Sequence, residues 1–229
     1  MNRCLAPSPR ILLQDSHLVA LHKPSGWFTH PTALDRNAPD ATTWLKGQGL
    51  RAQAAHRLDR GASGLLLFGL TASAANDLMR QFREGEVKKT YQAWVRGWVN
   101  HPGWVDGPLE TERGLQQAYT RFAPLAWAEP PWPLGQHTTA RFSLLQLMPS
   151  TGRQHQLRRH LARIGHPILG DSSHGDARVN RTFAQHLGCQ RLELCATQLT
   201  CFHPATGLPV ALSTAPDLAC LPDAALPPV

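Results

Sequence analysis

The segment "AHRLDRGASG", residues 55–64, places one carboxylate between two arginines in a glycine-rich turn. Arg57 and Arg60 flank Asp59 on either side. Nearby cations favour the ionised form of a carboxylic acid even where water is partly excluded. An ionised aspartate suits a nucleophile, whereas a general acid must hold its proton. The same residues also fit an ordinary Arg–Asp surface turn, so this segment alone leaves both interpretations open.

A second group of reactive side chains lies in "STGRQHQLRRHLARIGHP", residues 150–167, which we interpret as a turn followed by a helix. We expect Arg159 and Arg163, one turn apart, to share an exposed face that binds phosphates. Arg158 lies beside an apolar stripe, so we expect it to point inward, where it needs a carboxylate such as Asp59. The cluster has no acidic residue, and its other members are Arg153, His155, His160 and His166, with the stripe formed by Leu157, Leu161 and Ile164. A merely solvated basic helix is the alternative.

Tyr91 is a third candidate, because it lies in the alternating segment "VKKTYQAWVRGWV", residues 87–99, which predicts a strand. A tyrosine on such a strand commonly packs in the core with its hydroxyl at the edge. It could instead stack on a nucleobase. The sequence pattern does not choose between these two roles.

The composition favours a polyanionic partner, since 23 lysines and arginines against 16 acidic residues give a net charge of +7. Five cysteines (4, 189, 195, 201 and 220) form no Cys-x-x-Cys pair, and no zinc-binding His pattern occurs. The chain has no long apolar stretch, no signal-peptide core at its start and no glycine-rich phosphate loop. We therefore expect a cytoplasmic protein without metal or cofactor, and not a small-molecule phosphate enzyme.

The remaining pattern predicts one α+β domain with mostly antiparallel strands. Two short strands are expected within 11–26, one over 64–70, one over 138–149 and two within 191–212, and a helix is expected from Thr71 to Gly85. Residues 101–137, rich in proline, glycine and tryptophan, are expected to be a long connection or insertion. We expect Trp127 and Trp132 to pack rather than to touch RNA.

Five segments together resemble the RluA family of pseudouridine synthases, in order from about Ile11 to Leu212. They are "LVALHKPSGWFTHP", "HRLDRGASGLLLFGLT", "KKTYQAWVRGW", "TGRQHQLRRHLARIGHPILGD" and "RLELCATQLTCFHPATG". The stretch over 158–181 is most similar to the tRNA pseudouridine-65 synthases, the TruC group. Ala62 stands where the family usually has threonine, and Cys195 where histidine is common.

The resemblance implies a fold and a set of roles. It implies the pseudouridine synthase catalytic core, a long mixed, mostly antiparallel sheet flanked by helices and loops, over residues 11–212, with tails at 1–10 and 213–229 and no S4 domain. Asp59 matches the catalytic aspartate, Tyr91 the tyrosine that packs against the target uracil, and Arg158 the arginine that pairs with the aspartate. Arg57 matches the basic residue beside the flipped nucleotide. The other residues expected to bind substrate are His56, Arg60, Arg153, His155, Arg159 and Arg163.

These expectations converge on an isomerase that acts on structured RNA, with uridine 65 of tRNA as the expected target. The alternatives are a ribosomal-RNA synthase of the same family and a non-catalytic RNA-binding protein on the same scaffold. We expect a monomer with no membrane association and no obligate protein partner. Whether Asp59 attacks C1′ or C6, or removes a 2′ proton, stays open.

Overall fold

The computed structural model describes residues 7–33, 35, 37–188, 190–222 and 224–225. The chain divides into two compact units. Unit 1 contains Met1–Lys89 and Ala196–Asp217, and unit 2 contains Thr90–Cys195 and Leu218–Val229. The chain therefore passes from one unit to the other within two of its strands and again near its end. The single catalytic domain expected over 11–212 stays a prediction.

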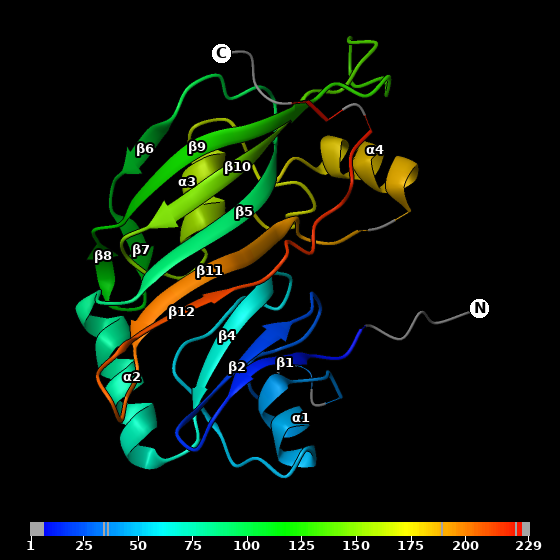
Figure 1. Cartoon of the computed structure of the whole chain (residues 1–229). Helices are drawn as coiled ribbons and strands as arrows, with labels where there is room; N and C mark the ends of the chain where they lie inside the picture. Colours follow the sequence, from blue (N-terminus) through cyan, green and yellow to red (C-terminus); the bar gives the residue numbers. More distant parts are fainter. Residues whose placement is uncertain (1–6, 34, 36, 189, 223, 226–229) are drawn as a thin grey trace. The chain divides into compact units, whose positions relative to one another are not determined.

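Unit 1 is built on strands β1 (Arg10–Gln14), β2 (Leu18–Lys23) and β4 (Ser63–Gly69), in the order β1-β2-β4-β11 (Figure 1). The short β3 (Gln53–Ala54) pairs with β4, and β12 (Pro209–Ser213) pairs with β11 (Leu194–Phe202). Every residue of β2 and β4 is buried, and the apolar run over 64–70 predicted this for β4. Two helices, α1 (Ala41–Gly47) and α2 (Ala72–Glu84), complete this unit.

Gly64 lies at the start of β4, where the backbone comes close to β11. Its φ of +105° lies in a region that side chains disfavour, and a Cβ there would collide with the backbone of Ala196 on β11. Glycine at this position therefore lets the two backbones approach each other directly after the Asp59 loop.

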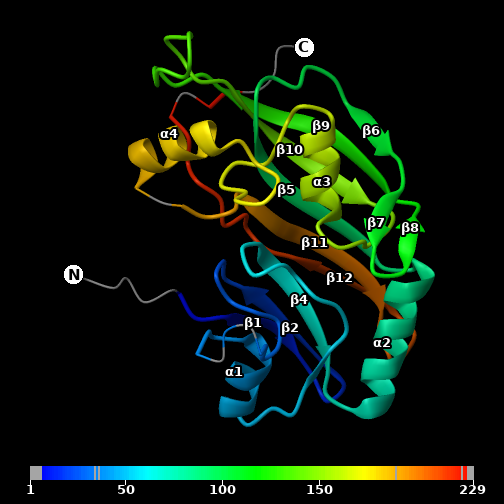
Figure 2. The same cartoon turned by 180° about the vertical axis from the view of Figure 1, so that it is seen from behind.

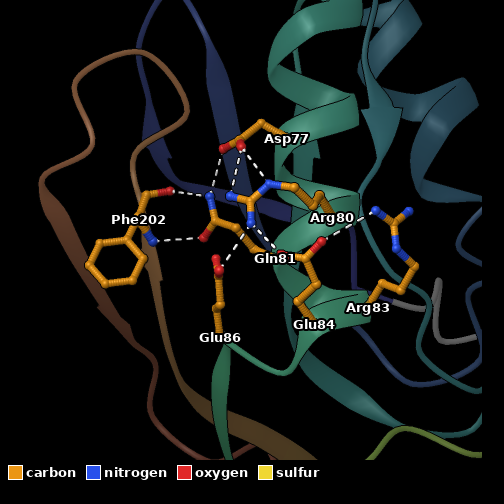
Figure 3. Close-up of polar contacts among 7 residues, drawn as sticks. All are labelled: Asp77, Arg80, Gln81, Arg83, Glu84, Glu86 and Phe202. Atoms are coloured by element: carbon orange, nitrogen blue, oxygen red, sulfur yellow. Dashed lines mark hydrogen bonds and ion pairs between the residues drawn. The ribbon is translucent and has the colours of Figure 1, made fainter.

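Helix α2 begins and ends where the sequence predicted. The Thr71 hydroxyl accepts from the backbone N–H of Ala74, and Gly85 ends the helix with φ of +76°. Figure 3 shows the ion pairs on its surface, where Arg80 contacts Asp77, Glu84 and Glu86. On the same helix, the buried Gln81 hydrogen-bonds both backbone groups of Phe202 at 2.8 Å, which ties α2 to β11.

Unit 2 has the strand order β5-β10-β9-β6, with all described pairs antiparallel. These strands are β5 (Lys88–Arg96), β6 (Gly103–Asp106), β9 (Tyr119–Ala128) and β10 (Phe142–Pro149), and a separate hairpin pairs β7 (Leu109–Thr111) with β8 (Gly114–Gln116). Seen from behind, α3 (Gln156–Arg163) lies in front of β9 and β10 (Figure 2). The α+β class is confirmed. The expectation of a long connection over 101–137 is wrong, because four strands occupy it.

A second helix of unit 2, α4 (Ala177–Leu187), buries Val179 and Phe183 in a cluster with aromatic side chains of the strands. Trp132 belongs to this cluster and stacks on His186 at 4.6 Å between ring centroids. The expected packing of Trp132 is confirmed. Trp127 is half-buried, and its indole N–H donates to the carbonyl of Val99.

Two further features are the lengths of the helices and the state of the cysteines. No helix among the described residues is long and apolar enough to cross a membrane. Cys195, Cys201 and Cys220 form no disulfide among the described residues, whereas Cys4 and Cys189 lie outside them.

Candidate active site

Asp59 lies in the irregular loop between β3 and β4 and is half-buried. Its carbonyl accepts from the backbone N–H of Ala62 at 3.1 Å, which closes the turn around Gly61. The aspartate thus stands just before a fully buried strand, as the sequence predicted.

The segment 24–29 holds this loop on both sides of Asp59. Gly26 donates its N–H to the carbonyl of Arg60 at 2.8 Å, and the Ser25 hydroxyl donates to the carbonyl of Gly61 at 2.6 Å. On the other side, the buried Thr29 hydroxyl accepts from the N–H of Leu58 and donates to its carbonyl. Bonds on both flanks restrict the backbone of the aspartate, and such preorganisation is what a reactive group needs.

Lys23 reinforces the same loop from inside the protein, and sequence reasoning did not assign it a role. The side chain is fully buried, and its ammonium donates to the carbonyls of Pro24 (3.0 Å), Trp27 (2.9 Å) and Ala62 (2.6 Å). Carbonyl dipoles compensate part of the cost of burying the charge. Lysine is rarely buried, so residue type alone gave no signal for this position.

The two arginines beside Asp59 are placed differently from the sequence argument. Arg60 forms an ion pair with Asp35 at 3.5 Å, donates to the carbonyl of Gly26 and lies over the ring of Phe28. Arg57 is exposed, and among the described residues its side chain makes no hydrogen bond or ion pair. Arg60 is thus engaged by another carboxylate, and the expected effect of the two cations on Asp59 stays a prediction.

His56, expected to bind substrate, has a structural environment. Its Nε2 accepts from the backbone N–H of Leu67 at 3.1 Å, and its ring stacks on Phe82 at 4.3 Å between centroids. Burial, together with the charge of Lys89, lowers the pKa of His56 to about 3. The ring is thus neutral at physiological pH and serves as a hydrogen-bond acceptor within unit 1. Its role as an RNA contact stays a prediction.

In unit 2, Tyr91 lies in the middle of β5, opposite Leu147 of β10, and is half-buried. The strand predicted over 87–99 is confirmed, and the residues that follow Tyr91 in β5 include the buried Ala93, Trp94 and Val95. A half-buried ring keeps part of its surface accessible. The position is compatible with either role considered for this residue.

Arg158 points inward, as predicted from its place in the helix, and it has a carboxylate partner that the sequence analysis missed. Its Nε and Nη2 each donate to one oxygen of Asp171 at 2.7 Å. Burial would raise the pKa of Asp171, but the Arg158 guanidinium and the backbone N–H groups of His174 and Ser173 lower it overall. This bidentate pair fixes the plane of the guanidinium.

His155 precedes α3 in a left-handed conformation, with φ of 52°. Its Nδ1 lies 3.1 Å from Nε2 of His174, and the two rings meet edge to face. The αL conformation is uncommon for a residue other than glycine, so the surrounding structure must hold it. It aims the His155 ring at the segment that carries Asp171.

The other arginines of the basic helix reach the insertion that contains β7 and β8. Arg153 donates to the carbonyl of Gln117 at 3.2 Å, and Arg159 donates to that of Glu110 at 2.8 Å. The guanidinium of Arg163 lies against Gly107. These side chains therefore hold the insertion, although a guanidinium that bonds one carbonyl keeps further donors for phosphates. Ile164, expected in the buried stripe, is 36% exposed.

The predicted site residues fall into two groups. Unit 1 carries Asp59 with His56, Arg57 and Arg60, and unit 2 carries Tyr91, Arg158 and the remaining basic residues. The expected pairing of Arg158 with Asp59 stays a prediction.

Residues 17–163, which include the Asp59 loop, Tyr91 and Arg158, match the model of a family described as RNA pseudouridylate synthase. The chain belongs to this family. The resemblance seen in the five segments is confirmed, and so is the predicted enzyme class, an isomerase that modifies RNA.

Relatives of this pseudouridylate synthase agree over most of its length. The tRNA pseudouridine synthase C of Yersinia pestis is 44% identical over 211 residues, which cover 86% of this chain and 82% of that protein. The protein of the same name from Vibrio cholerae is 40% identical over 216 residues, covering 88% of each.

Solved structures of human proteins share the fold. Human RNA pseudouridylate synthase domain containing 1 matches with a TM-score of 0.72 at 22% identity, covering 94% of this chain and 86% of that one. Human RNA pseudouridylate synthase domain containing 4 matches with a TM-score of 0.65 at 25% identity, covering 93% of this chain and 88% of that one. The first likeness supports the fold alone.

Proposed function

We propose that this protein converts uridine 65 of tRNA into pseudouridine, with Asp59 as the nucleophile. The observation that carries the proposal is the Asp59 loop, which matches the family's catalytic segment and is held on both flanks by the segment 24–29. The names of the bacterial relatives support tRNA as the substrate. We also propose that the protein is a monomer with one catalytic domain over 11–212 and that it acts in the cytoplasm without a metal or cofactor.

The reaction breaks the N1–C1′ bond, rotates the base and rejoins it to the sugar through C5; C5 then loses its proton and N1 gains one, so the product is an isomer of uridine. The uridine must first leave the helical stack, at a cost of a few kcal/mol that pocket contacts offset. In this proposal the Asp59 carboxylate attacks covalently or stabilises positive charge on the sugar, as carboxylates do in glycosidases. Tyr91 packs against the uracil. Arg158, oriented by Asp171, keeps the aspartate ionised, and Arg57 contacts the flipped nucleotide.

The substitution Asp59→Asn tests this proposal, because it keeps the shape of the side chain and removes the charge. We expect the variant to fold normally and to bind a tRNA transcript, yet to form no pseudouridine at position 65 by chemical probing. Turnover by the purified variant would contradict the nucleophile role. Normal modification of ribosomal RNA by the wild-type protein, with none in tRNA, would instead favour the ribosomal alternative.

A further inference from the structure

A hollow of about 450 Å³ lies in unit 2, and its lining contains none of the residues proposed for catalysis. The lining comes from the end of β5, the connection between β9 and β10 and the start of α4. We name it the arginine pocket, and the residues of its lining used below are Arg96, Gly135, Arg141, Asp176 and Arg178.

Two arginines of this pocket are oriented by carboxylates. Arg96 donates to Asp176 at 2.6 Å and to the carbonyl of Gly165 at 3.2 Å. Arg141 donates through Nε to Glu129 at 3.0 Å. A guanidinium has five N–H donors, so each arginine keeps donors that these bonds do not use. Holding the two side chains in place lowers the entropy cost of binding a further acceptor.

The third arginine supplies positive charge that is not compensated. Arg178 is exposed in the first turn of α4, and among the described residues its side chain has no hydrogen bond or ion pair. Its Nη1 would lie 3.5 Å from a Cβ at Gly135, so the guanidinium extends across the pocket wall. Three guanidiniums against the two carboxylates of Asp176 and Glu129 leave a net positive site, which favours an anion.

The exposed indole of Trp98 lies next to Arg141. The Arg141 guanidinium lies 4.3 Å from the ring centroid of Trp98, which stacks on Trp127 at 5.6 Å. Trp98 is 37% exposed, and its faces are occupied by Arg141 and Trp127. The indole therefore holds the Arg141 guanidinium in place by a cation–π contact at the pocket.

We propose that the arginine pocket binds a backbone phosphate of the RNA substrate, with Trp98 holding the Arg141 guanidinium in place. Arg96 follows Tyr91 by five positions along β5, so the two lie about 16 Å apart at the ordinary rise of a strand. The nucleotide bound here is therefore not the uridine that reacts. The inference rests on the proposed function, because it takes RNA as the substrate.

The substitution Arg178→Ala tests the phosphate contact, with Arg83→Ala as its matched control. Arg83 is also an exposed helical arginine, 71% exposed, but it lies beside the acidic side chains of α2 in unit 1 (Figure 3). We expect Arg178→Ala to weaken binding of a tRNA transcript about three- to tenfold and to reduce the slope of log Kd against log salt by about one. The KM for tRNA should rise while kcat is retained. Arg83→Ala should leave all of these values at the wild-type level.

Trp98 provides a second test with a different physical signature. Trp98→Ala should weaken binding about threefold without changing the salt slope, since it removes the cation–π contact that orients Arg141 but removes no charge. Trp98→Phe should retain most of the affinity.

The outcomes separate this inference from the proposed function. Wild-type affinity and salt slope in Arg178→Ala, with the wild-type enzyme active on tRNA, would overturn the pocket and leave the function intact. An equal loss in Arg83→Ala would show a general charge effect and would also overturn it. Absence of pseudouridine formation by the wild-type protein would overturn the function, whatever the pocket binds.

Discussion

The His56 ring accepts a hydrogen bond from the N–H of Leu67, and it can do so only while Nε2 carries no proton. Burial and the neighbouring Lys89 charge lower the pKa of His56 to about 3 in the folded protein, against an ordinary value of 6.5. Between these two pH values the unfolded chain binds a proton that the folded protein does not. The free energy of unfolding must therefore decrease as the pH falls from about 6.5 towards 3.

We predict that His56→Gln reduces this pH dependence, because glutamine also accepts a hydrogen bond but does not titrate. Because the unfolded variant no longer binds this extra proton, the slope of the free energy of unfolding against pH should fall by about 1.4 kcal/mol per pH unit. Urea denaturation at pH 4, 5, 6 and 7 measures the slope. An unchanged slope would show that another group, such as the buried His160, accounts for the effect.

Arg158 and Asp171 form a buried pair whose members depend on each other. We predict that Arg158→Met or Asp171→Leu alone lowers stability by about 3–5 kcal/mol, because each leaves a buried charge without its partner. The double variant Arg158→Met, Asp171→Leu should recover most of that stability but form no pseudouridine. Denaturation midpoints and product assays measure the two effects separately. A double variant as unstable as the sum of the singles, or one that is active, would contradict the prediction.

At the scale of elements, Gln81 joins α2 to β11 through both backbone groups of Phe202, and its amide also donates to Asp77 (Figure 3). We predict that Gln81→Ala lowers the free energy of unfolding by about 2–3 kcal/mol, since these hydrogen bonds are lost at a buried site. Asn76→Ala removes an exposed amide from the same helix and should change it by less than about 0.5 kcal/mol. Equal effects in thermal or urea denaturation would show that helix propensity, and not the link to β11, decides the stability.

Elements with strong local signals could be predicted from the sequence. The capped and striped α2 and the fully buried β4 are examples, because their patterns do not depend on distant residues. Strand β9 was missed because Pro124 lies in it, opposite Leu145, next to a shift of register. A proline lacks the N–H that a central strand needs, so its presence favours a loop unless a bulge accommodates it. Helix α4 carried usable signals in Asp176, Val179, Phe183 and Gly188, whereas the seven-residue α1 offered little.

The residues of the candidate site divide in the same way, into those that local sequence predicts and those whose position depends on tertiary packing. The helical position of Arg158 predicted its inward direction, since that depends only on local periodicity. Its partner Asp171 lies beyond the end of the helix, in a segment whose path depends on tertiary packing. Lys23 could not be predicted, because its burial depends on carbonyls of two separate loops.

For the whole molecule, the net charge of +7 indicated a polyanionic partner without indicating where it binds. Several arginines are already paired with carboxylates of the same chain: Arg80 with three of them, Arg96 with Asp176 and Arg158 with Asp171. Exposed arginines such as Arg57 and Arg178 are better placed to meet phosphates. The paired arginines orient other side chains and stabilise the fold, so the net charge is a poor guide to the number of RNA contacts.

The position of β4 between β2 and β11 has a consequence for the synthesis of the protein on the ribosome. Strand β4 and its neighbour β2 leave the exit tunnel early, while residues 194–202 of β11 are made near the end. Until then one edge of an entirely buried strand lacks its partner, and such edges are prone to pair with other chains. The nascent chain is therefore expected to need shielding by chaperones through most of translation.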